Sequence, residues 1–108
     1  MTEPQREGRK DDTGKDPWDL APFDAFRAIV GVLAFGAKKY GAYNWTQGMA
    51  WSRLYAATFR HLTAWWEGEH ADHETGLSHL AHAGACVCFL IAFELRGIGT
   101  DDRPGVAR

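Results

Sequence analysis

The sequence predicts a small all-α domain, and three observations support that fold class. Apolar residues recur at spacings of three and four in three separate segments, which is the period of an amphipathic helix. No run of alternating apolar and polar residues, the pattern of a half-buried strand, lies between these segments. The 108 residues are 45% hydrophobic and 24% charged, an ordinary globular composition for a single domain.

The first helix is predicted over about residues 22–40. Pro22 suits the first helical turn, and Asp24 suits the positive end of the helix dipole. Gly41 ends the helix directly after Lys38 and Lys39, which are favourable at its negative end. One apolar stripe is formed by Phe23, Phe26, Val30, Leu33 and Ala37.

The second helix is predicted over about residues 52–67, with Ser52 as its N-cap and Gly68 closing it. The apolar face of this helix consists of Tyr55, Phe59, Leu62 and Trp66.

The third helix is predicted over about residues 75–96 and is apolar nearly all round. Its middle contains small residues around Gly84, which would let another helix approach closely. Three short helices enclose only a thin core, so we expect a homo-oligomer that completes the helical bundle through this helix. A compact three-helix monomer is the alternative.

The ends of the chain differ in composition from its middle. Residues 1–14 are polar and are expected to be a flexible arm, residues 15–96 a single domain, and residues 97–108 a flexible tail. Cys86 and Cys88 are too close in sequence to pair within a helix, and no apolar stretch has the length of a signal peptide or a membrane span. These features predict a cytoplasmic protein without a membrane partner.

The charges are strongly segregated along the chain. A formal net charge of −2 argues against binding to long nucleic acid. Residues 25–66 nevertheless hold no acid and five basic side chains, and all five histidines fall between positions 61 and 82 beside a group of acids. A basic, aromatic segment next to an acidic, histidine-rich one predicts a site for a metal ion and a small phosphorylated ligand with a ring system.

The acidic segment offers candidate metal ligands. Carboxylate oxygens are preferred by Mg²⁺ and Mn²⁺, whereas Zn²⁺ is less favoured here because no cysteine lies nearby. The alternative is a solvated acidic loop that precedes a helix. The candidate ligands are Glu67, Glu69, Asp72 and Glu74.

His79 and His82 are the candidate catalytic or metal-binding histidines. Their spacing of three residues places both on one face of a helix, and His61 can join them if the second and third helices pack antiparallel. Imidazole titrates near neutral pH, so either histidine could be a ligand or a general base. The alternative is a pair of hydrogen-bonded core or interface histidines.

Cations and aromatic residues supply candidate nucleotide contacts. Their alternative is a set of solvated cations and core aromatics. The candidates for phosphate are Lys38, Lys39, Arg53, Arg60 and His61, and the candidates for the ring and base are Tyr40, Asn44 and Trp45. No P-loop, GxGxxG motif or nucleophile elbow is present.

Several blocks, in order, resemble the phage-associated dATP/dGTP diphosphohydrolase N-terminal domain family. The blocks are GKDPWDLAPFD (14–24), FGAKKYG (35–41), NW (44–45), WSR (51–53), RHLTAWWEGE (60–69), Asp72 and ETGLSHLAH (74–82). The resemblance implies hydrolysis of a purine deoxynucleoside triphosphate to the monophosphate and pyrophosphate. It also implies kinship with the MazG-like all-α pyrophosphohydrolases, which use Mg²⁺ or Mn²⁺ and work as oligomers.

The chain departs from the MazG-like metal motifs, Glu-x-x-Glu on one helix and Glu-x-x-Asp on the next. The corresponding pair on the third predicted helix is His79 and His82, so carboxylates would have to come from the acidic segment or from Asp19 and Asp24. The leading hypothesis is a metal-dependent pyrophosphohydrolase in which Glu69 is also catalytic. The alternative is a protein that binds a nucleotide or a nucleotide-derived immune signal without cleaving it, a phage anti-defence sponge.

Overall fold

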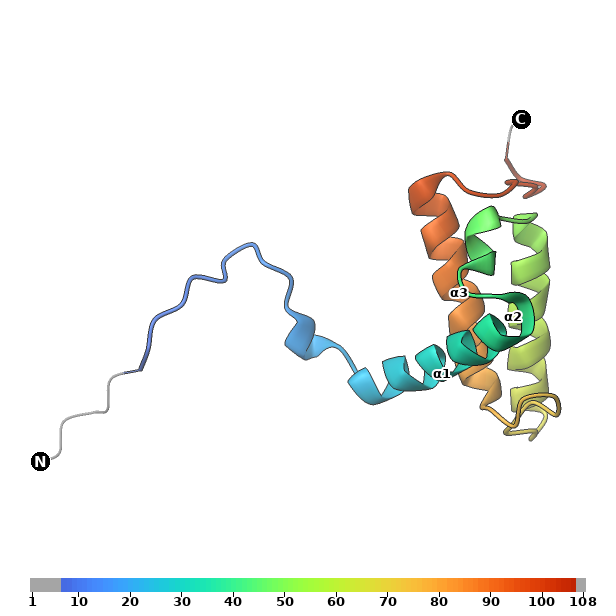
Figure 1. Ribbon diagram of the computed structural model, residues 1–108, viewed down its shortest axis with the longest axis horizontal. Helices are drawn as coiled ribbons and strands as arrows, with labels where there is room; N and C mark the ends of the chain where they lie inside the picture. The colour runs from blue at the N-terminus through green and yellow to red at the C-terminus, as the bar shows by residue number, and fades with distance from the viewer. Residues whose placement is uncertain (1–6, 107–108) are drawn as a thin grey trace, which may run out of the picture.

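The computed structural model describes residues 7–106, and these form helices and loops with no strand among them (Figure 1). The three α-helices are α1 (Phe23–Tyr40), α2 (Trp51–Trp66) and α3 (His79–Arg96). Two short 3-10 helices precede α1 and α2, namely η1 (Trp18–Leu20) and η2 (Asn44–Gln47). The predicted all-α class is confirmed.

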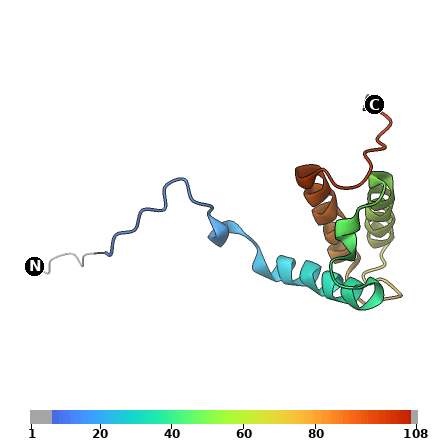
Figure 2. The same ribbon diagram turned by 45° about the horizontal axis from the view of Figure 1, so that its top comes forward.

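The helices α2 and α3 lie side by side and antiparallel, joined at one end by residues 67–78 (Figures 1 and 2). Helix α1 packs across α3, and its N-terminal half projects away from the pair. A Cβ added to Gly84 would lie 2.8 Å from Cδ1 of Ile29. This is the close helix approach that the small residues of α3 predicted.

The core of the domain is small. Its buried members are Leu54, Thr58, His79, Ala81, Ala83, Ala85 and Phe93, and α1 contributes none of them. Large apolar side chains such as Phe23, Val30 and Ile91 are at least half exposed instead. No apolar stretch of membrane-spanning length was expected from the sequence, but α3 is long and apolar enough to span a membrane by length and composition alone, a test that the core helix of a soluble protein also passes.

Helix α2 begins at Trp51, and Ser52 is not its N-cap. The N-cap position is Ala50, whose side chain cannot accept a hydrogen bond. A distant carboxylate replaces the missing cap, because the backbone N–H of Ser52 donates to Oδ1 of Asp102 at 2.9 Å. The local serine signal therefore suggested the wrong capping group.

Helix α3 begins at His79, later than the predicted start near residue 75. Residues 72–75 form a turn instead, in which Oδ2 of Asp72 accepts hydrogen bonds from the backbone N–H groups of Glu74 and Thr75. The hydroxyl of Ser78 then caps α3 by accepting from the backbone N–H groups of Leu80 and Ala81.

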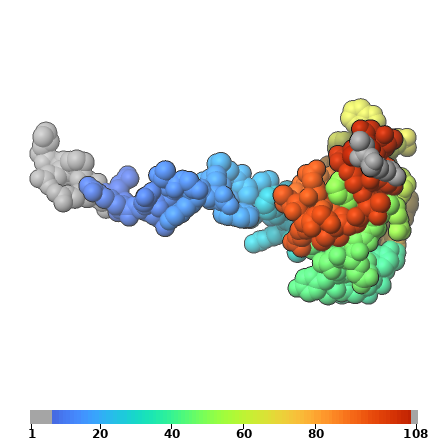
Figure 3. Space-filling model, turned by 90° about the horizontal axis from the view of Figure 1, so that it is seen from above, coloured from blue at the N-terminus to red at the C-terminus, as the bar shows by residue number. Residues whose placement is uncertain are grey.

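The two ends of the chain behave differently. Residues 7–14, part of the expected arm, are exposed and extend away from the helical body (Figure 3), while residues 1–6 and 107–108 lie outside the described range. Residues 98–102, expected to be a flexible tail, instead contact the start of α2. Ile98 O accepts from Trp51 Nε1 at 2.9 Å, and Thr100 O accepts from the backbone N–H of Trp51 at 3.0 Å.

Candidate functional site

Two histidines face each other where α2 ends and α3 begins. His61 lies in the last turns of α2 and His79 is the first residue of α3, so the connection over residues 67–78 brings them together. Their Nδ1 atoms are 2.9 Å apart, and His79 is only 4% exposed. A hydrogen bond between two imidazole nitrogens requires one to donate and the other to accept.

His82 lies one turn further along α3 and stacks on His61. The two ring centroids are 4.6 Å apart and the ring planes differ by 9°. The i,i+3 spacing of His79 and His82 therefore does place both beside His61, as the antiparallel arrangement predicted.

The loop between α2 and α3 brings Glu69 against His79. Oε1 of Glu69 lies 3.1 Å from Nε2 of His79, and also 3.1 Å from Nε2 of the exposed His73. The His79 contact is not directed along the ring N–H, and this buried Nε2 has no hydrogen-bond partner within the described chain. A buried nitrogen without a hydrogen-bond partner lowers the stability of the fold. Its presence here is a sign that the position serves a function.

Asp72 is tied to His82 through Thr75. Oγ1 of Thr75 lies 3.2 Å from Oδ2 of Asp72 and 2.7 Å from Nε2 of His82, and it accepts from the backbone N–H of Leu77. An ionised carboxylate only accepts, so the single hydroxyl proton of Thr75 goes to Asp72. Nε2 of His82 must then carry its own proton and donate to Thr75, which leaves Nδ1 of neutral His82 with a lone pair.

The surroundings set the charge states of this cluster. Burial lowers the pKa of His61, and the neighbouring His82 and His79 lower it further. Burial also lowers the pKa of His82, with partial opposition from Asp72. Burial alone would raise the pKa of Asp72, but the hydrogen bonds from Thr75 and the nearby histidines outweigh it and lower that pKa. Neutral imidazoles thus adjoin an ionised carboxylate.

This donor set suits a divalent ion. His61, Asp72 and His79 each offer one ligand atom, and these atoms lie within 4.8 Å of one another. Neutral imidazole and ionised carboxylate are the forms in which these side chains bind metals. The set differs from the carboxylate group expected from sequence, since it contains two nitrogens and one of the four predicted acids.

Comparisons with known proteins identify the family of this chain. The sequence profile of the family described as "dATP/dGTP diphosphohydrolase, N-terminal" matches residues 5–103. The chain belongs to this family. A dATP/dGTP diphosphohydrolase from Salmonella phage PMBT28 is 38% identical over 105 residues, which cover 92% of this chain and 36% of the relative. The chain therefore spans little more than a third of that relative's length. No solved structure matches the chain.

In this member of the diphosphohydrolase N-terminal family, the other two predicted acids have no direct contact with the histidines among the described residues. Glu74 forms an ion pair with Lys39 of α1. Glu67 is the C-cap of α2, exposed, and lines a shallow hollow on the outer face of that helix together with Arg60.

The predicted nucleotide contacts are distributed over the family domain. Lys39 also lies 5.2 Å from the ring centroid of the exposed Tyr40. Trp45 stacks on Phe89 at 5.3 Å, and the guanidinium of Arg96 lies 5.1 Å from its ring centroid. The remaining candidates are Lys38, exposed at the end of α1, Asn44, half-buried in η2, and Arg53, exposed in the first turn of α2.

Sequence reasoning missed Thr75 as the link between Asp72 and His82. The signal was present in part, because an Asp in a turn commonly accepts a hydrogen bond from the backbone N–H two residues further on, as Asp72 does from Glu74. The same reasoning placed His61 among the candidate phosphate contacts, and in the structure His61 lies beside His79 and His82.

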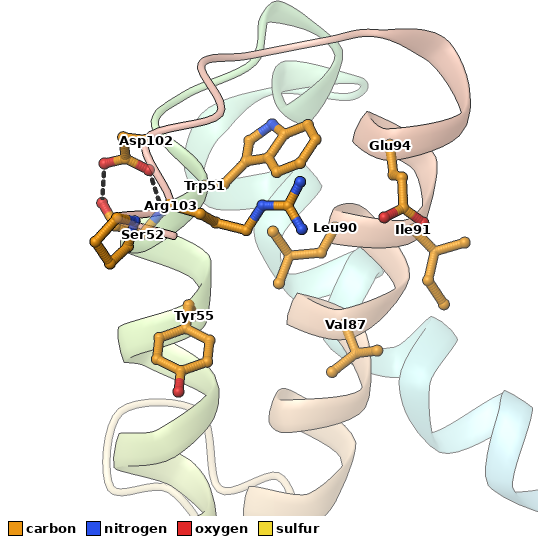
Figure 4. A pocket seen from close by; sticks show the side chains of 10 residues that line it. Trp51, Ser52, Tyr55, Val87, Leu90, Ile91, Glu94, Asp102 and Arg103 are labelled. Carbon is orange, nitrogen blue, oxygen red and sulfur yellow. Dashed lines mark hydrogen bonds between the residues drawn. The ribbon is translucent and has the colours of Figure 1, made fainter. Parts of the chain in front are cut away.

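A second hollow lies at the other end of the α2–α3 pair (Figure 4). This groove of about 400 Å³ runs between the first turns of α2 and the last turns of α3. Arg103 reaches over Trp51 there, with its guanidinium 5.2 Å from the ring centroid. The lining is mostly apolar, with Tyr55, Val87 and Leu90 among its members.

Proposed function

We propose that this chain is a nucleotide-hydrolysing domain that converts a purine deoxynucleoside triphosphate to the monophosphate and pyrophosphate, with Mg²⁺ or Mn²⁺ as the expected cofactors. The observation that carries the proposal is the cluster of His61, His79, His82, Glu69 and Asp72 at one end of α2 and α3. The name of the phage relative, dATP/dGTP diphosphohydrolase, supports the substrate class.

In the proposed reaction, a water oxygen attacks the α-phosphorus and the bond from that phosphorus to the bridging oxygen breaks. Pyrophosphate leaves with the electron pair of that bond. The water proton passes to Nδ1 of His82, whose orientation follows from the hydrogen bond between its Nε2 and Thr75. A divalent ion bound beside Asp72 would neutralise the phosphates and lower the pKa of the attacking water.

Lys39 is the cation that we propose to hold phosphates near this cluster. Its ion pair with Glu74 ties the end of α1 to the loop that carries Glu69 and Asp72. A triphosphate would compete with Glu74 for the ammonium group. Tyr40 is exposed beside Lys39 and is the aromatic ring that a base could reach, whereas Trp45 packs on Phe89.

We also propose that the domain self-associates, through α1 instead of the α3 interface expected from sequence. Phe23, Phe26 and Val30 lie on one side of this helix and are 52%, 42% and 58% exposed, while no residue of α1 is buried. A second copy placed against this stripe would remove the apolar surface from water.

The test is to incubate the purified chain with dGTP or dATP and either Mn²⁺ or Mg²⁺, and to follow the products by ³¹P NMR. We expect monophosphate and pyrophosphate, with ¹⁸O from labelled water in the monophosphate. His82→Gln should lower kcat about 10²–10⁴-fold, the range for loss of a general base. His70→Gln, at an exposed histidine of the same loop, should be unchanged.

Recovery of intact nucleotide with every ion would overturn the proposal, as would full activity in His82→Gln. Label found in pyrophosphate rather than in the monophosphate would show attack at the β-phosphorus and contradict the proposed bond cleavage.

A further inference from the structure

We infer that His61, Asp72 and His79 form a site for a first-row transition-metal ion, in the series from Mn²⁺ to Zn²⁺, and that the site discriminates against Mg²⁺. The role of the ion in this inference rests on the proposed function, whereas its binding to these three residues does not. The inferred site replaces the four predicted acidic ligands with two imidazoles and one carboxylate.

The spacing of the two histidines fits two ligands of one ion. Metal–nitrogen bonds are about 2.0–2.1 Å long, so two nitrogens around one ion are about 3 Å apart in octahedral and about 3.3 Å apart in tetrahedral geometry. The Nδ1 atoms of His61 and His79 are 2.9 Å apart. The same distance serves a hydrogen bond in the metal-free chain and neighbouring ligand positions in the metal-bound one.

Ligation through Nδ1 also accounts for the other nitrogen of His79. A metal-bound histidine commonly donates its second ring N–H to a carboxylate, which fixes the tautomer and the ring orientation. Nε2 of His79 is buried without a hydrogen-bond partner in the described chain, and Oε1 of Glu69 is 3.1 Å away. The 3.1 Å contact is not a hydrogen bond in this structure, so we infer that Glu69 accepts this N–H once Nδ1 binds the ion, which makes it a positioning residue rather than a ligand.

Asp72 is prepared for ligation by the turn that follows it. Three hydrogen bonds, from the backbone N–H groups of Glu74 and Thr75 and from the Thr75 hydroxyl, all go to Oδ2. Oδ1 is the oxygen that these bonds leave for the ion. His82 stacks on the ring of His61 and contacts Thr75, which is hydrogen-bonded to Asp72. It therefore helps to position both His61 and Asp72.

The donor atoms determine which ions fit. Mg²⁺ requires oxygen ligands in near-ideal octahedral geometry and rarely takes imidazole, whereas imidazole suits Fe²⁺, Co²⁺, Ni²⁺ and Zn²⁺. Of the other two predicted acids, Glu67 is the exposed C-cap of α2, and Glu74 lies in the same turn as Asp72 but pairs its carboxylate with Lys39. Affinity should therefore rise from Mn²⁺ through Co²⁺, following the general order for divalent ions.

The test measures metal binding by the full chain after removal of metals with a chelator, without nucleotide. Co²⁺ titration should produce visible absorption bands of a nitrogen-ligated ion, and calorimetry should show binding of Mn²⁺ and Co²⁺ at least tenfold tighter than of Mg²⁺. His61→Gln and Asp72→Asn should abolish the bands. Glu69→Gln should keep them but weaken affinity about 10–100-fold, as expected of an outer partner. His70→Gln is the matched control.

Folding of each variant is checked by far-UV circular dichroism, and ¹⁵N NMR of the wild-type imidazoles reports ligation through Nδ1 directly. Mg²⁺ binding as tight as that of Mn²⁺, or Co²⁺ bands that survive both His61→Gln and Asp72→Asn, would overturn the inference. The two proposals fail separately. Metal binding without nucleotide turnover contradicts only the proposed function. Nucleotide turnover with Mg²⁺ that is unchanged in His61→Gln contradicts only this inference.

Discussion

The hydroxyl of Thr75 lies 2.7 Å from Nε2 of His82, and this contact ties the loop before α3 to the second turn of that helix. Replacing the hydroxyl with a methyl group removes a hydrogen-bond partner from the half-buried imidazole N–H of His82 and from the carboxylate of Asp72. We expect Thr75→Val to lower the free energy of unfolding by about 1–3 kcal/mol, the cost of a buried polar group left unpaired. Urea denaturation measures this loss, and Thr75→Ser should recover most of it.

A second prediction concerns the distant cap of α2. Asp102 accepts from the backbone N–H and the hydroxyl of Ser52. Asp102→Ala should destabilise the domain by about 0.5–2 kcal/mol, the range for loss of a helix N-cap. Ser52→Ala keeps the backbone bond and should cost less. Equal thermal denaturation curves for wild type and Asp102→Ala would show that the contact adds nothing to stability.

Gly99 holds the same segment against the start of α2. Its φ is +80°, and an added Cβ would lie 2.4 Å from the backbone O of Met49. Because neither the φ nor the backbone oxygen can relax freely, Gly99→Ala should cost about 1–3 kcal/mol. Gly97 also has a positive φ, +65°, but open space around it. Gly97→Ala should therefore cost less in the same chemical denaturation experiment, and a larger loss there would contradict this explanation.

The sequence correctly predicted those features that depend only on residues close together in the chain. The apolar stripe and Gly41 correctly bounded α1, and the spacing of His79 and His82 correctly placed both on the face that meets His61. Such patterns depend on helix geometry and need no knowledge of distant contacts.

The features that sequence missed depend on pairs far apart in the chain. Asp102 caps a helix that begins fifty residues earlier, so the glycine-containing segment around it was expected to be a flexible tail. Glu69 and Glu74 looked equivalent as acids in one loop. Only the fold shows that Glu69 meets His79 whereas Glu74 is paired with Lys39 of α1.

The two cysteines offer a pH-dependent prediction away from the histidines. Burial raises the pKa of the Cys86 thiol, whereas Cys88 is exposed. The thiolate is the reactive form, so a raised pKa reduces the reactive fraction at a given pH. Iodoacetamide at pH 8 should modify Cys88 first, and modification of Cys86 should still accelerate as the pH rises above 9. Mass spectrometry of timed samples measures both rates, which should converge in denaturant.

The last prediction tests self-association through α1. Phe26 lies on the exposed apolar stripe of this helix, and a glutamate there would place a charge in the proposed interface. Phe26→Glu should weaken association at least tenfold by analytical ultracentrifugation, while its helix content stays that of wild type. Ala28→Glu adds the same charge at an exposed position on another side of α1 and should leave association unchanged. A wild-type chain that sediments as a 12.0 kDa monomer at all concentrations would show that water, and not a second copy, covers the stripe.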